Sequence, residues 1–403
     1  MSPAEKLAPG APPANDFIPL IVPEIRGNEW AYVKECLDTN WVSSVGSYVD
    51  RFEQMTAEVA GTRYAVATGS GTAALHIALV LAGVERDDEV LVSTLTFIAP
   101  ANTIRYVGAH PVFIDADPLY WQMDPIAVTR FLEQECERDG SAFRNRRTGR
   151  RVRAILPVHI LGHPVDLDPI LEIAARHNLP VIEDATEGLG ARYKGKGLGS
   201  LGQTGCFSFN GNKIITTGGG GMLVTNDAAL AKRARYLTTQ AKDDPIEYIH
   251  NEVGYNYRLT NVLAALGCGQ MEQLQGYIDT KRAIAARYHE ALAHVPGITL
   301  PAQAEWASST YWMYTILLDE EVTHISSREL LRELHARKIQ TRPLWQPMHH
   351  SPAHQGAEPR SCPVADGLHR QALSLPCSVG LTPSAQADVT DAIIDSISKA
   401  ARR

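Results

Sequence analysis

Short runs of apolar and β-branched residues alternate with longer stretches of helical periodicity from about residue 64 onward. The short runs predict strands, and the longer stretches, such as 72–83 and 164–178, predict helices. This alternation is typical of an α/β fold with a mostly parallel sheet covered on both faces, whose ligands gather at the carboxyl ends of the strands. The predicted strands are 64–68 (YAVAT), 89–93 (EVLVS), 111–115 (PVFID), 153–159 (RAILPVH) and 180–184 (PVIED).

The pattern changes after about residue 258. A long helical stretch follows at 259–295, and Gly276 can break it because glycine weakens a helix interior. The segments beyond it predict a smaller α+β domain. They are a strand at 310–319, a helix at 327–338, a short strand at 339–343 and a closing amphipathic helix at 384–403.

Length and composition bound the domain organisation. The chain has 403 residues, of which 44% are hydrophobic and 21% charged, an ordinary globular balance in a length that suits two or three domains. Its beginning is rich in alanine and proline and lacks the apolar core of a signal peptide. We therefore expect a disordered arm at 1–16, a large domain at 17–275 and a small domain at 276–403.

Charge and hydropathy narrow the range of partners. The net charge of -7 argues against general nucleic-acid binding, and no apolar run approaches the ~20 residues that a membrane helix needs. We expect a cytoplasmic protein without a nucleic-acid or membrane partner. Because the cysteines lack the paired spacing of metal sites, we also expect no metal and six reduced, buried thiols. These are Cys36, Cys136, Cys206, Cys268, Cys362 and Cys377.

The segment 138–153 is dense in arginine and carries turn signals at Asp139-Gly140 and Thr148-Gly149. We interpret it as a solvated surface hairpin. The alternative is a patch that meets the phosphates of a substrate, because arginine suits bidentate phosphate contacts. That patch would consist of Arg146, Arg147, Arg150 and Arg151.

The stretch 67–75, ATGSGTAAL, is the first with candidate chemistry. A strand ends there and Gly69-Ser70-Gly71-Thr72 opens a helix. Free backbone N–H groups and the helix dipole at such a start favour a phosphate, although a serine or threonine there is often only a helix cap. The stretch matches neither the Walker pattern nor the dinucleotide-binding pattern.

Two further stretches carry an acid and a lysine. In VIEDATEGLGA, 181–191, a strand delivers Glu183 and Asp184 at its carboxyl end, where an acid can bind ribose, a metal or a protonated ring nitrogen, or only cap the next segment. In SFNGNKIITTGGGGM, 208–222, Lys213 lies between an apolar-aromatic run and four glycines. A desolvated lysine is a nucleophile, but a lone lysine is usually a solvated surface residue.

The three stretches together indicate pyridoxal phosphate. This cofactor needs a lysine that attaches its aldehyde carbon, an acidic partner for its ring nitrogen and a phosphate site. Lys213, Asp184 and the helix start at Gly71 supply these parts in order on a parallel sheet. The glycine run would let backbone close around the ring without side chains.

With these motifs the chain resembles the sugar aminotransferases of the DegT/DnrJ/EryC1/StrS group, from about Ile18 to its C-terminus. The resemblance implies the type I fold of pyridoxal phosphate-dependent transferases. The N-terminal stretch 22–53 is similar to aminotransferases of the legionaminic acid pathway, which act on a UDP-linked sugar. The motifs are GSGTAAL, TFIAPANTI, VHILGHPVDL, IEDATEGLGA, SFNGNK, GYNYRLTNVLAALG, PLWQPMH and ALSLPCSVGLT.

The resemblance also assigns roles to single residues. It makes Lys213 the residue that attaches the cofactor and Asp184 the partner of the ring nitrogen. Asn256 would reach the phosphate from the other subunit, which implies a homodimer with shared sites. Cofactor contacts are further implied for Gly71 and Thr72 at the phosphate, Ser208 at the phosphate, Phe97 on the ring face and Glu187 near the phenolic oxygen. The family often has glutamine or histidine where this chain has Glu187, which leaves the role of Glu187 open.

The activity implied is transfer of an amino group from L-glutamate to UDP-4-keto-6-deoxy-GlcNAc in a ping-pong reaction. Substrate contacts are expected at Trp41, Ser43, His159 and His349, with a core anchor as the alternative for Trp41 and a packed, hydrogen-bonded histidine for His159. Other acceptors, such as an octulosonate or a dTDP-keto sugar, stay open. A related dehydratase would replace Lys213 with histidine, and a regulator that binds the cofactor without turnover is the rival from another class.

Overall fold

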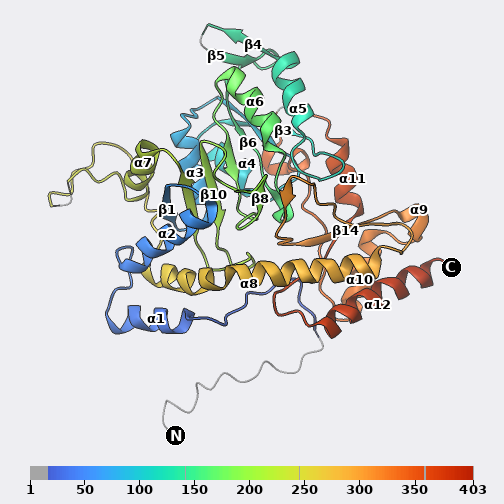
Figure 1. Cartoon of the computed structure of the whole chain (residues 1–403). Coiled ribbons are helices and arrows are strands. Elements are labelled where there is room, and N and C mark those ends of the chain that lie inside the picture. The colour runs from blue at the N-terminus through green and yellow to red at the C-terminus, as the bar shows by residue number, and fades with distance from the viewer. Residues whose placement is uncertain (1–16, 141, 245, 358–359, 403) are drawn as a thin grey trace.

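A computed structural model describes residues 17–402 of the chain, apart from 141, 245, 358 and 359 (Figure 1). At its centre, a four-stranded sheet of order β1-β11-β10-β7 meets a three-stranded sheet of order β6-β2-β3. Parallel bridges from Ile155 to Val181 and from Val158 to Asp184 join the two into one sheet. The strands are β1 Tyr64–Thr68, β2 Glu89–Ser93, β3 His110–Ile114, β6 Val152–Leu156, β7 Ile182–Asp184, β10 Thr204–Ser208 and β11 Gly221–Thr225.

The sheet is mostly parallel, as predicted, with β11 as the exception. β2 runs parallel to β3 and β6, and β10 runs parallel to β7, whereas β11 is antiparallel to both β1 and β10. A parallel pair needs a crossover of a dozen or more residues, usually a helix. Between β10 and β11 the chain has no helix that could form such a crossover, and β11 returns antiparallel. Lys213 lies in this loop, at the carboxyl end of β10.

Helices pack on the sheet and on one another. α3 is apolar on all sides and buried over most of its length, as expected of a helix in contact with β1, β10 and β11. α1 and α2 pack on the long helix α8, which runs beneath the sheet (Figure 1). The helices up to this point of the chain are α1 Glu29–Asp38, α2 Ser47–Ala60, α3 Gly71–Leu81, α4 Ala99–Tyr106, α5 Pro125–Arg130, α6 Leu167–His177, α7 Ala228–Thr238 and α8 Asn261–Leu292.

α8 is continuous through Gly276, so the break that this glycine allowed does not occur. A helical glycine costs about 1 kcal/mol relative to alanine. Its neighbours Leu274, Tyr277 and Ile278 are buried on the packed face, and their burial outweighs that cost. The predicted domain boundary at 275/276 falls inside this helix and stays a prediction.

The C-terminal part contains a small antiparallel sheet of order β12-β14-β15, flanked by helices. The predicted strand at 339–343 forms only isolated bridges, from Ile18 to Ile339 and from Arg342 to Ser374. The arm at 1–16 lies outside the described residues. The remaining elements are β8 Arg192–Tyr193, β9 Lys196–Gly197, β12 Ile298–Thr299, β13 Ala307–Ser308, β14 Tyr314–Leu318, α9 Glu320–Thr323, α10 Ser327–Ala336, α11 Pro363–Gln371, β15 Ala372–Leu375 and α12 Pro383–Ala400.

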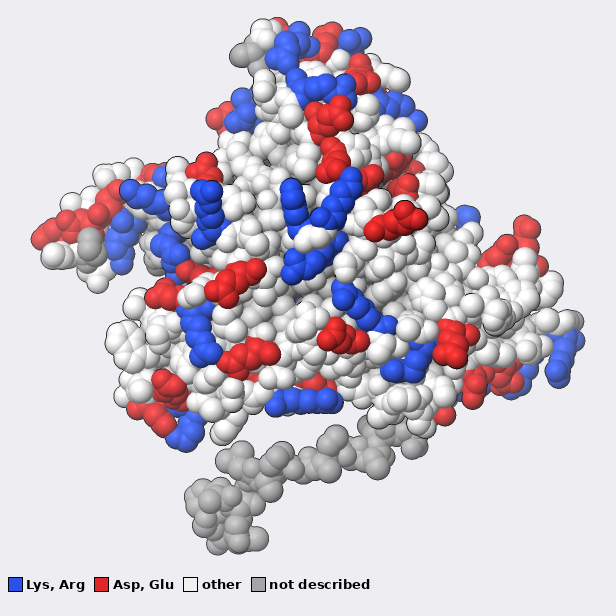
Figure 2. Space-filling view, viewed as in Figure 1, with Lys and Arg blue, Asp and Glu red and all other residues white. Residues whose placement is uncertain are grey.

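The arginine-rich segment contains a surface hairpin of β4 (Cys136–Asp139) and β5 (Ala142–Asn145), as predicted. Its arginines pair with carboxylates of the same end of the molecule, where Figure 2 shows both signs of charge interspersed. These ion pairs join Arg144 to Asp139 (2.9 Å), Arg146 to Glu137 (3.5 Å), Arg150 to Glu89 (3.9 Å) and Arg151 to Asp88 (2.7 Å).

All six cysteines are buried and free, which confirms the expectation for the thiols. Among the described residues, none of the helices combines the length and apolar character that crossing a membrane requires.

Candidate active site

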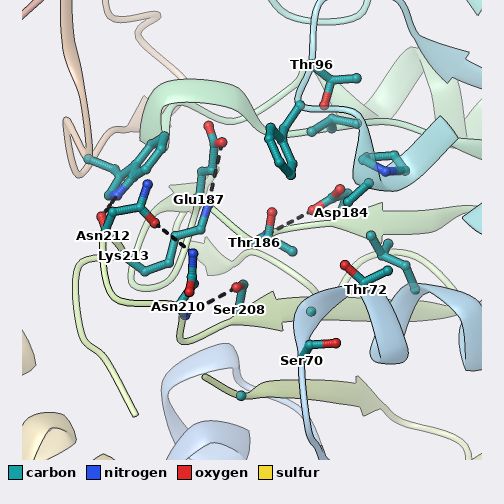
Figure 3. Close-up of a pocket in the computed structure, with 18 of the residues that line it drawn as sticks. Ser70, Thr72, Thr96, Asp184, Thr186, Glu187, Ser208, Asn210, Asn212 and Lys213 are labelled. Carbon is teal, nitrogen blue, oxygen red and sulfur yellow. Dashed lines mark hydrogen bonds and ion pairs between the residues drawn. The ribbon is translucent and has the colours of Figure 1, made fainter. Parts of the chain in front are cut away.

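A cavity of about 210 Å³ opens where β7 and β10 end and α3 begins (Figure 3). Its wall brings together Lys213, Asp184, Glu187 and Ser208 with the first residues of α3. The position agrees with the rule that open α/β sheets bind ligands outside the carboxyl ends of their strands. Residues from three separate stretches of sequence therefore meet in one place.

The start of α3 forms the anion-binding end of the cavity. Ser70 caps the helix by accepting a hydrogen bond from the Ala73 N–H at 3.0 Å, and its carbonyl accepts from the Ala74 N–H at 3.1 Å. In the described part of the chain, the N–H groups of Gly71 and Thr72 find no acceptor. Two free amides at a helix N-terminus, beside the Thr72 hydroxyl, suit a phosphate.

The glycines around this cup allow backbone to pack on backbone. A Cβ on Gly221 would lie 2.3 Å from the carbonyl carbon of Ser70 and 2.5 Å from the nitrogen of Gly71. A Cβ on Gly71 would lie 2.8 Å from the Cβ of Ser208. Gly218 has a φ of +77°, a conformation that favours glycine. Part of the glycine run is therefore needed to seat β11 directly against the start of α3.

Asp184 lies at the end of β7 and is 1% exposed. It accepts a hydrogen bond from the Thr186 N–H at 3.0 Å. Burial raises the pKa of Asp184, while hydrogen bonds from Thr186 and the charge of Lys213 act in the opposite direction. A carboxyl held in this way gains most from a cationic partner, such as a protonated ring nitrogen.

Lys213 and Glu187 face each other across the cavity (Figure 3). The Lys213 Nζ lies 3.6 Å from a Glu187 carboxylate oxygen and 4.3 Å from the centre of the Trp312 ring. Burial raises the pKa of Glu187 to about 7, against the lowering effect of Lys213. The Leu161 N–H donates to the other oxygen of Glu187 at 2.8 Å. Glu187 can therefore hold or release a proton near neutral pH beside the Lys213 amine.

Glu183, the neighbour of Asp184, points to the other face of the strand and has a structural role. It accepts hydrogen bonds from the N–H groups of Gly199, Leu201 and Gly202 at 2.6–2.8 Å, and from His159 at 3.2 Å. Burial raises its pKa, but these hydrogen bonds prevail and the pKa of Glu183 is lowered.

His159 is completely buried and lies outside the wall of the cavity. Its Nδ1 accepts from the Val165 N–H at 2.9 Å, so the neutral ring carries its proton on Nε2 and donates it to Glu183. These contacts fit the alternative of a packed, hydrogen-bonded histidine. Through Glu183, His159 supports the strand end that presents Asp184.

The other predicted contacts divide between the cavity and the surface. Phe97 lines the cavity and is 54% exposed. Trp41 is 56% exposed, so it is not a core anchor, and neither Trp41 nor Ser43 lines the cavity within a single chain. His349 lies just outside the cavity, where its Nδ1 is 2.7 Å from the Thr94 hydroxyl. Asn256 is exposed and also lies outside the wall.

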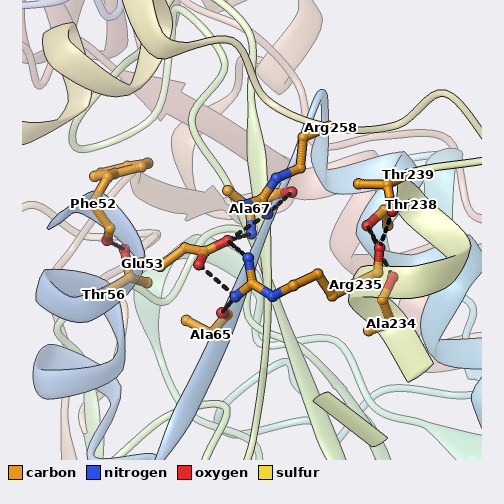
Figure 4. A network of polar contacts seen from close by, with 10 residues as sticks. All are labelled: Phe52, Glu53, Thr56, Ala65, Ala67, Ala234, Arg235, Thr238, Thr239 and Arg258. Carbon is orange, nitrogen blue, oxygen red and sulfur yellow. Dashed lines mark hydrogen bonds and ion pairs between the residues drawn. The ribbon is translucent and has the colours of Figure 1, made fainter. Parts of the chain in front are cut away.

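An ion-pair network centred on the buried Glu53 holds the segment next to Asn256 (Figure 4). Glu53 of α2 accepts from the Ala67 N–H at 2.8 Å and pairs with Arg235 at 2.6 Å and with Arg258. The carbonyl of Tyr257, between Asn256 and Arg258, accepts from the Gly69 N–H at 2.7 Å. The network therefore fixes the loop before the phosphate cup and presents Asn256 outward.

Several residues that line the cavity were not predicted. They include Asn212, Trp312 and Trp345, and Trp312 donates its ring N–H to the Asn212 carbonyl at 2.7 Å. The two tryptophans come from the C-terminal part, 99 and 132 residues beyond Lys213 in the sequence. A tryptophan in an apolar run is usually read as core, so only the tertiary arrangement reveals them.

The chain was compared with known proteins. The model of the DegT/DnrJ/EryC1/StrS aminotransferase family matches residues 23–394. The chain is 40% identical to a GDP-perosamine synthase of Caulobacter vibrioides over 381 residues, covering 94% of this chain and 98% of the relative. It is 38% identical over 376 residues to EpsN of Bacillus subtilis, named as a pyridoxal phosphate-dependent aminotransferase, covering 92% and 94%.

Among solved structures, DesV of S. venezuelae is 32% identical and superposes with a TM-score of 0.82. The match covers 93% of this chain and 99% of DesV. The fold is thus shared over nearly the whole length.

Proposed function

The chain belongs to the DegT/DnrJ/EryC1/StrS aminotransferase family, and from this premise we propose that it aminates a nucleotide-linked 4-keto-6-deoxy sugar with L-glutamate as donor. As a member, it is a pyridoxal phosphate-dependent sugar aminotransferase. The observation that carries the proposal is the meeting of Lys213, Asp184 and the α3 N-terminus around one cavity.

The residues present fit the cofactor. The free N–H groups of Gly71 and Thr72 and the hydroxyl of Ser208 would hold its phosphate. Asp184, buried and 3.0 Å from the Thr186 N–H, would face the ring nitrogen. Lys213, only 13% exposed, would attach the aldehyde carbon.

When bound, pyridoxal phosphate supplies an electron sink for negative charge at the carbon that carries the amino group. Asp184, as a carboxylate, keeps the ring nitrogen protonated, which makes that sink effective. The Lys213 Nζ, when free, moves a proton as general acid and base. Glu187, 3.6 Å away and with a pKa of about 7, can stabilise the protonated form of Lys213. Phe97 and Trp312 would exclude water from this space.

Two nucleotides are candidates for the acceptor. The resemblance of the N-terminal stretch to legionaminic-type enzymes favours a UDP-linked sugar, UDP-4-keto-6-deoxy-GlcNAc. The name of the Caulobacter relative, a GDP-perosamine synthase, favours a GDP-linked sugar. We keep the UDP-linked sugar as the first proposal and the GDP-linked sugar as the second.

We further propose a homodimer in which Asn256 of the partner subunit completes the phosphate site. Asn256 is exposed and lies outside the cavity of its own chain. The loop before it exposes large apolar side chains, with Ile246 and Val253 each 82% exposed, and such side chains are typical of a surface covered by a partner.

The experiment follows the two half-reactions separately. L-Glutamate should bleach the visible absorbance of the cofactor-loaded enzyme, and the correct keto sugar should restore it. UDP-, GDP- and dTDP-linked 4-keto-6-deoxy sugars and an octulosonate are then offered to the glutamate-treated enzyme. Restoration by a UDP-linked sugar with the highest kcat/KM supports the first proposal, and restoration by the GDP-linked sugar supports the second. A regulator would bind the cofactor and fail to respond to either substrate.

A further inference from the structure

The turn at 160–162 holds a leucine in a backbone conformation that side chains rarely adopt. Leu161 has φ 60° and ψ 10°, in the left-handed region, and Gly162 follows with φ 86°. This conformation brings the Cβ of a leucine too close to the following carbonyl, so it persists only where the surrounding structure enforces it. Leu161 is also buried. Contacts from outside the turn must therefore hold it.

Gln122 supplies two of these contacts from a buried position. The Ile160 N–H donates to its Oε1 at 3.0 Å, and its Nε2 donates to the Ile160 carbonyl at 3.3 Å. The same Nε2 donates to the Tyr120 carbonyl at 3.0 Å, and the Gln122 carbonyl accepts from the Asp117 N–H at 2.7 Å. The side chain of Gln122 is thus fixed itself, and it pairs with both backbone groups of the residue that precedes Leu161.

The other end of the turn is held by the C-terminal part of the chain. The Gly162 carbonyl accepts from the Thr310 N–H and from the Ser309 hydroxyl, both at 3.0 Å. A Cβ on Gly162 would lie 2.4 Å from the Thr310 Oγ1, so the approach is close as well. With both of its neighbours restrained, Leu161 cannot relax into a more favourable conformation.

The strained conformation aims one N–H group at the active site. The Leu161 N–H donates to one oxygen of Glu187 at 2.8 Å, and the other oxygen of Glu187 lies 3.6 Å from the Lys213 Nζ. Burial and the charge of Asp184 raise the pKa of Glu187, whereas the charge of Lys213 and the Leu161 N–H lower it. The place of this N–H therefore affects both the direction of the carboxyl and its affinity for a proton.

We propose that Gln122 is a positioning residue, which holds the turn so that the Leu161 N–H fixes Glu187 opposite the Lys213 amine. This rests on the proposed function, in which Glu187 stabilises the protonated form of Lys213. Gln122 does not line the active-site cavity, so it acts through the turn. A residue that only fills a core is usually apolar. An amide paired with both backbone groups beside a strained leucine serves the geometry of the turn instead.

The test follows the titration of Glu187 in the cofactor-free enzyme. Urea unfolding is measured from pH 5 to pH 9 for the wild type and Gln122→Met, each with and without Glu187→Gln, so that the difference isolates Glu187. Methionine fills the space but cannot hold Ile160, and Leu161 should leave the left-handed region. A hydrogen bond that favours the carboxylate is then lost, so the pH midpoint of Glu187 should rise by about one pH unit.

Two further variants separate this role from a loss of packing. Leu161→Gly, added to Gln122→Met, should return the midpoint part of the way, because glycine adopts a positive φ without a steric penalty. Gln122→Asn keeps the amide on a shorter side chain and should raise the midpoint by a smaller amount. It decides the question if Gln122→Met does not fold.

Tyr288→Phe is the matched control, since it removes one buried hydrogen bond, from the Tyr288 hydroxyl to the Pro376 carbonyl at 2.8 Å. It should lower stability equally at every pH and leave the midpoint of Glu187 unchanged. In the cofactor-loaded enzyme, Gln122→Met should slow the half-reaction at saturating L-glutamate roughly tenfold, part of what a positioned acid–base group contributes. KM for L-glutamate should stay within about twofold.

A midpoint that stays at the wild-type value or falls in the Gln122 variants overturns the proposal, and so does a raised midpoint that Leu161→Gly leaves unrestored. A raised midpoint with an unchanged half-reaction rate also overturns it, because Glu187 would then not assist Lys213. If no keto sugar restores the absorbance of the glutamate-treated wild type, the proposed function fails, while the cofactor-free titration still decides whether Gln122 positions Glu187.

Discussion

Replacing Glu187 by glutamine should change how the stability of the cofactor-free enzyme depends on pH. In the folded chain, burial raises the pKa of Glu187 to about 7 from an ordinary value of 4.5, even though Lys213 lies 3.6 Å away. The folded state therefore keeps a proton on this carboxyl at pH values where the unfolded chain has already lost it. By linkage, the contribution of the protonated Glu187 carboxyl to the stability of the fold is fully present below pH 4.5, and it is lost as the pH rises through 7.

The size of the effect follows from the shift. The two pKa values differ by about 2.5, and each pKa unit corresponds to about 1.4 kcal/mol. Deprotonation of Glu187 therefore lowers the free energy of unfolding by about 3 kcal/mol as the pH rises from below 4.5 to above 7. Roughly 2.5 kcal/mol of this lies between pH 5 and pH 8. Glutamine has nearly the same shape and no titratable proton. The wild type should therefore lose about 2.5 kcal/mol more than Glu187→Gln between these two pH values.

The assay is urea unfolding of both proteins, stripped of cofactor, at equal protomer concentration and at intervals from pH 5 to pH 8. Glu305→Gln, which alters an exposed carboxyl, is the matched control and should follow the wild type. Lys213→Met should move the wild-type midpoint above 7, because the lysine charge lowers the pKa of Glu187. Parallel pH profiles for the wild type and Glu187→Gln would refute the reasoning.

Three further changes test other parts of the site. Gly221→Ala would bring a methyl group to 2.3 Å from the Ser70 carbonyl carbon, so the start of α3 should shift and the cofactor Kd should rise at least tenfold in a fluorescence titration. An unchanged Kd would contradict the tight packing. Asp184→Asn should still bind cofactor yet lose most of kcat, because a neutral amide cannot keep the ring nitrogen protonated; near wild-type kcat would count against this role. Glu53→Gln leaves Arg258 without its carboxylate, so the free energy of unfolding measured by denaturation should fall by about 3 kcal/mol or more. A fall under about 1 kcal/mol would show that the network contributes little to stability.

The sequence predicts the strands of the central sheet well because their apolar runs are short and bounded by turn residues. The predicted strand EVLVS coincides with β2, and YAVAT coincides with β1. The prediction went wrong where tertiary contacts outweigh local preference. α8 continues through Gly276 because the burial of neighbouring side chains on both sides outweighs the low helix propensity of glycine. The expected strand at 339–343 is reduced to isolated bridges.

The same division holds for the site. Asp184 and Lys213 were predicted because each lies in a motif whose residue types fit one chemistry, and the structure places both in one cavity. His159 looked similar in sequence, yet it is turned to the opposite side of the strand end, toward Glu183. Trp312 and Trp345 were missed because no local pattern distinguishes a residue that lines a cavity from one that packs in a core.

The central claim is that the chain attaches pyridoxal phosphate through Lys213 at the end of β10. The most direct measurement is borohydride reduction of the yellow, cofactor-loaded enzyme, followed by digestion and mass spectrometry of the peptides. The account predicts a phosphopyridoxyl label on the peptide that contains Lys213, and no label and no visible band in Lys213→Ala. A chain that stays colourless when pyridoxal phosphate is supplied, or a label on another lysine, would contradict it.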